Sequence, residues 1–233
     1  MSKRKKKKGT CVYCGFQGPV TDDHVPPRSF YPKAPPKNLI TVPSCETCNK
    51  TFAKDDDYAR LVLTTAEGAL GNASRNELIP IVKRFAERAE SKRILRTVYE
   101  SLRSGYYETP GGISIRRQQF ALEGERLDAF AKRVIKGLFY LEKRYRLPDD
   151  CTIHAINHRR MSEFEDLAGP NRDFYALILT ELAEHTERRS WGDVFGYSWV
   201  QSPNYSDATW WLLDFYGRPQ YLCNTLRDDV ASE

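Results

Sequence analysis

The chain has 233 residues, 40% of them hydrophobic and 29% charged, which suits a folded protein with one core or two small ones. No apolar run approaches the ~20 residues of a membrane span, and no apolar stretch follows the basic N-terminus as in a signal peptide. These absences predict a cytoplasmic protein without a membrane segment. The net charge is +5, and the six basic residues from Lys3 to Lys8 account for all of it, because the rest of the chain sums to −1.

The first predicted element is a basic, disordered arm over residues 1–9, because like charges repel and nothing in the arm can be buried. Such an arm can lie along a phosphate backbone and add affinity that depends on salt but not on sequence. A solubilising tail or a localisation signal is the other interpretation of the same charges.

Four of the six cysteines form two C-x-x-C pairs, Cys11 with Cys14 and Cys45 with Cys48. Two residues between thiolates let both sulfurs reach one tetrahedral ion from a tight turn, and two such pairs close the coordination sphere. A redox C-x-x-C usually occurs singly and would not explain the second pair. The spacing therefore predicts a structural zinc site with these four cysteines as its ligands.

Residues 10–70 are predicted to form a zinc module that contains both C-x-x-C pairs. The pairs are separated by a proline-rich loop that can form neither a regular helix nor a central strand. Ser44, directly before Cys45, suits the N-cap of a helix that follows the second pair. A short apolar step over residues 19–21 comes before the loop, a strand-like segment over residues 38–43 follows it, and a helix is expected over residues 49–69.

Residues 71–233 are predicted to form an α+β body that ends in antiparallel strands. Apolar residues at helical spacing predict three helices, over residues 80–102, 123–145 and 172–187. Residue alternation predicts strands over residues 106–108, 113–115, 151–157, 194–201, 209–216 and 220–224. A hairpin turn at Gly217-Arg218-Pro219 joins the last two strands, and Ser162-x-x-Glu165 is a possible capping box. The fold class is therefore α+β.

Several chemically distinctive residues of the body are interpreted as structural. Four tryptophans alternate with other apolar residues, which favours the core of the C-terminal sheet over a base-stacking platform: Trp191, Trp199, Trp210 and Trp211. Cys151 and Cys223 are interpreted as buried core thiols. The isolated histidines are interpreted as surface or core residues: His154, His158 and His185.

The candidate chemistry lies inside the cysteine frame. Asp23 offers a hard carboxylate oxygen and Asn49 a carbonyl oxygen, so together they could hold one Mg²⁺ or Mn²⁺ ion, which would stabilise developing charge on a phosphate. Side chains alternate along a strand, which places His24 opposite Asp23, yet a bent strand could bring its imidazole to the phosphate as general base. Asn38 could orient the His24 ring.

The order Cys-x-x-Cys, Asp-His-Val-Pro-Pro, Asn-Leu-Ile, Cys-x-x-Cys-Asn resembles the HNH endonuclease family in its zinc-stapled form. The resemblance covers residues ~10–60, where eight positions agree in order: the four cysteines, Asp23, His24, Asn38 and Asn49. It implies a treble-clef-like ββα-metal fold with His24 as general base, Asn38 as the middle asparagine, and Asp23 and Asn49 as metal ligands. Asn49 stands where the family often has histidine.

One departure from the family lies between His24 and Asn38, where the family often has glycines and this chain has prolines. Three basic residues of that loop could meet phosphates: Arg28, Lys33 and Lys37. The run Asp55-Asp56-Asp57 is interpreted as a solvated helix face in preference to a further ion site.

Together these features predict a metal-dependent endonuclease that hydrolyses phosphodiester bonds in nucleic acid, with DNA as the expected substrate. The alternative is a catalytically inactive zinc-stapled module that binds nucleic acid or protein. In a third hypothesis, the C-terminal body is the effector and the zinc module positions it.

Overall fold

The computed structural model describes residues 7–31, 35–65, 83, 86–87, 89–108, 111–157 and 170–228. Over these residues the fold mixes α and β, with four α-helices and ten strands, and every sheet is antiparallel. This agrees with the predicted α+β class.

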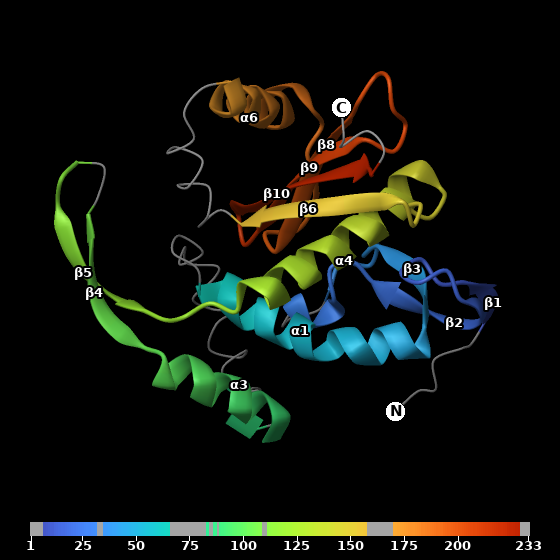
Figure 1. Ribbon diagram of the computed structural model, residues 1–233. Coiled ribbons are helices and arrows are strands. Elements are labelled where there is room, and N and C mark those ends of the chain that lie inside the picture. The colour runs from blue at the N-terminus through green and yellow to red at the C-terminus, as the bar shows by residue number, and fades with distance from the viewer. Residues whose placement is uncertain are drawn as a thin grey trace.

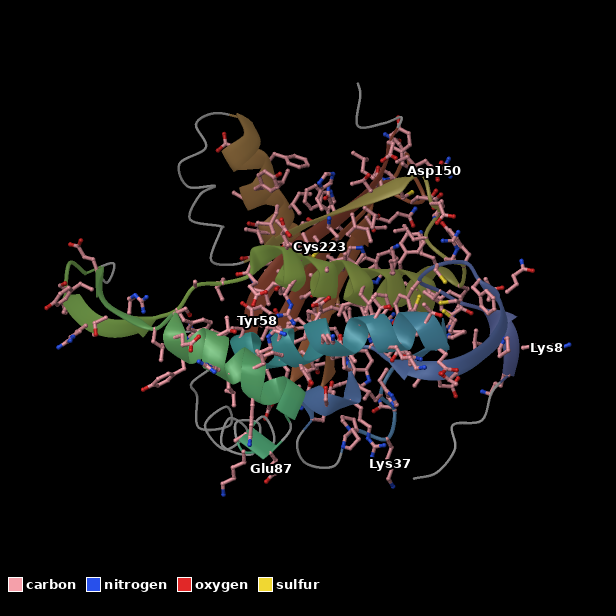
Figure 2. The ribbon with its side chains drawn as sticks, turned by 60° about the horizontal axis from the view of Figure 1, so that its bottom comes forward. Lys8, Lys37, Tyr58, Glu87, Asp150 and Cys223 are labelled. Carbon is pink, nitrogen blue, oxygen red and sulfur yellow. The ribbon has the colours of Figure 1, made fainter. Side chains whose placement is uncertain are left out.

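A three-stranded sheet at the N-terminus has the order β1-β2-β3 (Figure 1). Its strands are β1 (Lys7–Thr10), β2 (Gln17–His24) and β3 (Thr41–Cys45). The basic arm predicted for residues 1–9 is thus too long, because Lys7 to Gly9 pair with β2 as an edge strand. Lys8, at the outer edge of this sheet, points away from the body (Figure 2).

Helix α1 (Glu46–Thr65) begins directly after β3. Ser44, predicted to cap it, is instead a buried residue of β3, and its hydroxyl donates to the Cys45 carbonyl. The N-terminal end of α1 is therefore fixed by the cysteine pair that spans the junction between β3 and the helix.

The body is built on a five-stranded sheet of order β6-β10-β9-β8-β7. The strands are β6 (Cys151–Asn157), β7 (Arg189–Trp191), β8 (Phe195–Gln201), β9 (Thr209–Phe215) and β10 (Arg218–Arg227). The tight turn between β9 and β10 uses Tyr216 and Gly217, both with positive φ, one residue earlier than predicted.

Two helices pack against opposite faces of this sheet. Helix α6 (Pro170–Thr180) and a π-helical turn (Glu181–His185) pack on one face, around Leu182, Leu212 and Leu222. Helix α4 (Gly124–Lys143) crosses the other face and also contacts α1, so it lies between the body and the zinc module (Figure 1). Cys223 lies where α4 crosses the sheet (Figure 2).

One hydrophobic core runs through both parts of the chain. Phe30, in the short 3₁₀ turn Arg28–Phe30, stacks on Phe130 of α4 at 5.3 Å and lies 5.6 Å from Phe215 of β9, measured between ring centroids. All three rings are fully buried. The predicted zinc module and the predicted body are therefore packed as one unit.

A separate ribbon projects from this unit. Helix α3 (Ala89–Glu100) leads into the antiparallel strands β4 (Arg103–Glu108) and β5 (Ser114–Gln119), which extend away from the body (Figure 1). Three of its apolar side chains are largely exposed: Tyr99, Tyr106 and Ile113.

The structure confirms the interpretation of Trp211 and Cys223 as core residues and of His154 as a surface residue, whereas His158 lies outside the described residues. Trp211 is fully buried and Trp199 stacks on it at 5.2 Å. Cys223 is fully buried as predicted, whereas Cys151 is only half-buried. The capping box at Ser162 lies outside the described residues. Over the described part of the chain, no helix is long and apolar enough to cross a membrane.

Candidate functional site

The two C-x-x-C pairs meet at one end of the three-stranded sheet. The first pair lies in a tight turn, in which the Gly15 N–H donates to the Cys11 carbonyl at 2.9 Å and Gly15 adopts a φ of +74°. A residue with a Cβ is strained at that φ, which explains the glycine. The Val12 N–H donates to the Pro43 carbonyl at 2.9 Å, and this bond joins the first turn to the strand that carries the second pair.

The four thiols form a compact cluster, with all sulfur atoms within 4.8 Å of one another. The Sγ atoms of Cys14 and Cys45 are 3.8 Å apart. Zinc–sulfur bonds of about 2.3 Å in a tetrahedron place the sulfurs about 3.8 Å apart. Burial raises the pKa of the Cys11 thiol, but backbone N–H donors from Cys45, Cys14 and Tyr13 outweigh it and lower the pKa to about 7. The number, spacing and chemistry of these sulfurs fit zinc.

Strand β2, strand β3 and helix α1 extend from this cluster as a hairpin followed by a helix. His24 is the last residue of β2, is paired with Thr41, and is half-buried. Asn49 lies in the first turn of α1, and its side-chain nitrogen donates to the Thr21 hydroxyl at 3.1 Å. Because side chains alternate along a strand, Thr21 and Asp23 share the face of β2 that meets α1, and His24 lies on the other face.

Asp23 is held by an arginine from the body. Its Oδ2 accepts hydrogen bonds from Arg133 Nη2 at 2.8 Å and from the Tyr13 hydroxyl at 3.0 Å. Arg133, on α4, also pairs through Nη1 with Asp56 of α1. The side chains of Arg133 and Asp23 are only 5% and 10% exposed, so this ion pair is removed from solvent.

Two aromatic rings complete this arrangement. The Arg133 guanidinium carbon lies 4.8 Å from the centroid of the Phe52 ring and 5.6 Å from that of Tyr13. We refer to Tyr13, Asp23, Phe52, Asp56 and Arg133 as the Arg133 cluster. It combines the two interactions that stabilise a buried guanidinium, which are paired carboxylates and aromatic faces.

Helix α4 reaches the cluster because it approaches β2 closely at Gly137. A Cβ built on Gly137 would lie 2.6 Å from Val25 Cγ2. Val25 directly follows His24, and its N–H donates to the Ile40 carbonyl at 3.0 Å. The missing side chain of Gly137 thus allows α4 to lie against the end of β2, one helical turn beyond Arg133.

The aspartate run of α1 is not a solvated face, so that prediction is wrong. Each of its carboxylates pairs with an arginine: Asp55 with Arg126, Asp56 with Arg133 and Asp57 with Arg60. Two of these arginines come from α4, so the run joins α1 to the body. Burial raises the pKa of Asp56 to about 7, because the single guanidinium of Arg133 is shared with Asp23 and does not offset the desolvation.

Asn38 lies in the loop before β3 and is exposed. Its backbone carbonyl accepts a hydrogen bond from Trp191 Nε1 at 2.9 Å, which ties the loop to β7. This contact explains the position of the loop but uses no atom of the Asn38 side chain. Of the other loop residues, Arg28 and Lys37 are exposed and Lys33 lies outside the described residues.

The residues predicted to hold a divalent ion do not offer it an open site in this arrangement. Asp23, on the face of β2 that meets α1, and Asn49, in the first turn of α1, both offer hard oxygen atoms, which suits Mg²⁺ in chemistry. The Asp23 carboxylate, however, already binds a cation, the Arg133 guanidinium, in a buried position. The four sulfurs are the one metal-type cluster of cysteine, histidine and acidic residues within the part of the chain that the structure describes.

Comparisons of the chain with protein-family models, with curated proteins and with solved structures find no match. A functional proposal for this chain therefore depends on its sequence pattern and on the geometry of the site. Arg133 is the central residue of its cluster, and the sequence did not indicate it, because no motif surrounds it and it lies 110 positions from Asp23.

Proposed function

We propose that this chain is a zinc-anchored, HNH-type endonuclease that hydrolyses phosphodiester bonds in nucleic acid, with DNA as the expected substrate. The observation that carries the proposal is the β2–β3–α1 unit, in which four converging sulfurs fix the helix against the hairpin. This unit has His24 at the end of β2 and Asn49 in the first turn of α1. This order of hairpin, zinc cluster and helix supports the proposal, because it matches the order of elements in a ββα-metal centre.

His24 is the proposed general base. Its imidazole would accept a proton from the attacking water as the water oxygen bonds to phosphorus and the bond to the leaving oxygen breaks. Histidine suits this role because its ordinary pKa lies near neutrality. A Mg²⁺ or Mn²⁺ ion at Asp23 and Asn49 would stabilise charge on the phosphate, and this part of the proposal requires that Arg133 leave Asp23.

The distribution of charge supports a nucleic-acid substrate. The basic residues from Lys3 to Lys8 adjoin the zinc module, and residues 89–119 carry six arginines and lysines against three glutamates. The rest of the chain has a negative net charge, so the excess of positive charge lies in these two segments. Phosphate backbones bind such basic segments through counterion release.

The test is a plasmid-nicking assay with protein that contains one equivalent of zinc. Added Mg²⁺ or Mn²⁺ should support nicking, and His24→Ala should lower its rate by at least 100-fold while zinc content and fold are unchanged. His154→Ala is the matched control, because His154 is exposed on β6. Equal nicking by His24→Ala and the wild type would exclude the proposed site.

A second candidate function is a zinc-anchored module that binds nucleic acid without cutting it. The observation that favours it is the buried ion pair between Arg133 and Asp23, which uses the carboxylate that a nuclease would offer to its metal. Gel-shift titration of the same DNA separates the two functions. Salt-sensitive binding without nicking in either divalent ion would favour the second.

A further inference from the structure

Arg133 binds the Asp23 carboxylate, which the resemblance assigns to a divalent ion. Its Nη2 contacts the Asp23 carboxylate at 2.8 Å, and its Nη1 pairs with Asp56. The two carboxylates come from different elements, β2 and α1, and the cation that joins them comes from a third, α4. A positive charge is thus already supplied between the strand and the helix.

The charges of this group are incompletely balanced. Two carboxylates carry two negative charges when ionised, and Arg133 supplies one positive charge. Neutrality then requires that one carboxylate hold a proton or that a dication replace the guanidinium. The buried Nε of Arg133 has no hydrogen-bond partner among the described residues, so the guanidinium is not fully satisfied either.

We infer that Arg133 is the resident cation of the Asp23–Asp56 pair and excludes divalent ions from it as long as α4 holds its present position. This inference rests on the proposed function for its biological meaning, since hydrolysis would begin only after Arg133 leaves Asp23. Its physical content concerns cation binding alone. The position of α4, which belongs to the body, then decides whether Asp23 and Asp56 can bind a divalent ion in addition to the zinc at the four cysteines.

The experiment is titration of zinc-loaded protein with Mn²⁺ in the absence of nucleic acid, followed by the electron paramagnetic resonance signal of free Mn²⁺. The wild type should bind no Mn²⁺ at Asp23 up to 1 mM. Arg133→Met removes the cation but keeps an unbranched side chain. This variant should therefore bind one Mn²⁺ at Asp23 and Asp56, with a dissociation constant at least tenfold below the 1 mM at which the wild type still shows no binding. Adding Asp23→Asn to Arg133→Met should abolish that binding.

Arg133→Lys is the matched control, because it retains a positive charge and should exclude Mn²⁺ as the wild type does. If Arg133→Met folds but binds no more Mn²⁺ than the wild type, the inference is wrong. If Arg133→Met does not fold, the wild type still decides the question. Mn²⁺ binding by the wild type that Asp23→Asn removes would overturn the inference, and its absence up to 1 mM would support it.

These outcomes are separable from those of the proposed function. Arg133→Met that binds Mn²⁺ and cuts no DNA would support the inference and contradict the nuclease proposal. A wild type that binds Mn²⁺ through Asp23 and cuts DNA would contradict the inference and support the nuclease proposal.

Discussion

Arg133 Nη2 donates to Asp23 Oδ2 at 2.8 Å, across 110 positions of the sequence. This contact joins the zinc module to the body through a buried ion pair. It also determines which cation the Asp23 carboxylate binds, and the HNH resemblance assigns that carboxylate to a metal ion. The stability of the fold and the chemistry of the proposed site therefore depend on the same two residues.

The first prediction concerns the stability supplied by Arg133. Arg133→Met leaves two buried carboxylates without a cation, so it should lower the free energy of unfolding at pH 7 by about 3–5 kcal/mol. Arg126→Met is the matched control on the same helix, and its pair with Asp55 is more exposed. We expect a loss of about 1 kcal/mol or less there. Urea denaturation measures both, and equal losses would contradict a special role for Arg133.

The second prediction concerns the pH dependence introduced by Asp56. The pKa of Asp56 is raised to about 7 by burial, whereas its ordinary value is 3.8. The folded protein therefore retains a proton that the unfolded chain releases near pH 4. The resulting stabilisation is complete below pH 4 and is lost as the pH rises to about 7.

Asp56→Asn removes this titration. Relative to the wild type, the variant should gain roughly 2–4 kcal/mol of stability between pH 4 and pH 7. Urea midpoints at closely spaced pH values measure the difference. A difference that stays constant over this range would show that Asp56 is ionised throughout.

The third prediction concerns the close approach of α4 to β2. Gly137→Ala places a methyl group 2.6 Å from Val25 Cγ2, and we expect a net loss of about 1–3 kcal/mol despite the better helix propensity of alanine. Gly124→Ala, where nothing lies within 4 Å of the new Cβ, should be neutral or slightly stabilising. In a double-mutant cycle, Gly137→Ala should cost less stability in the Val25→Ala background than in the wild type, and an equal cost would show that Val25 is not the clashing residue.

The fourth prediction concerns zinc. Cys48→Ser should remove the bound zinc, measured by atomic absorption, whereas Cys151→Ser should keep it, since Cys151 lies on β6 outside the sulfur cluster. Because one core spans the zinc module and the body, the loss should lower the melting temperature of the whole chain. A loss of about 4 kcal/mol corresponds to roughly 8–16 °C. Retention of one equivalent of zinc by Cys48→Ser would contradict the four-cysteine site.

The zinc ligands and the order of strands and helix around them could be predicted because their signals are local. Two C-x-x-C pairs specify a tetrahedral site by spacing alone, and the helix predicted over 123–145 follows from apolar residues at helical intervals. The pairing of β1 was missed because Lys7 and Lys8 belong to a run of like charges. That run obscures the edge strand formed by its last residues.

The Arg133 cluster could not be predicted, for a different reason. A run of three aspartates in sequence is typical of a solvated surface. Only the packing of α4 against α1 places Arg126 beside Asp55 and Arg133 beside Asp56. Such packing depends on contacts between distant segments, of which Gly137 and Val25 form one. One sequence without these contacts gives no reason to pair Arg133 with Asp23.

The central claim is that this chain breaks phosphodiester bonds through His24, and single-turnover cleavage of an end-labelled oligonucleotide duplex tests it most directly. With Mn²⁺ and an excess of zinc-loaded protein, labelled fragments should accumulate for the wild type and for His154→Ala at similar rates. His24→Ala should yield none above background. Two results would contradict the claim: His24→Ala forms fragments as fast as the wild type, or neither the wild type nor any variant, Arg133→Met included, forms fragments. The second result would leave a zinc-anchored binding module.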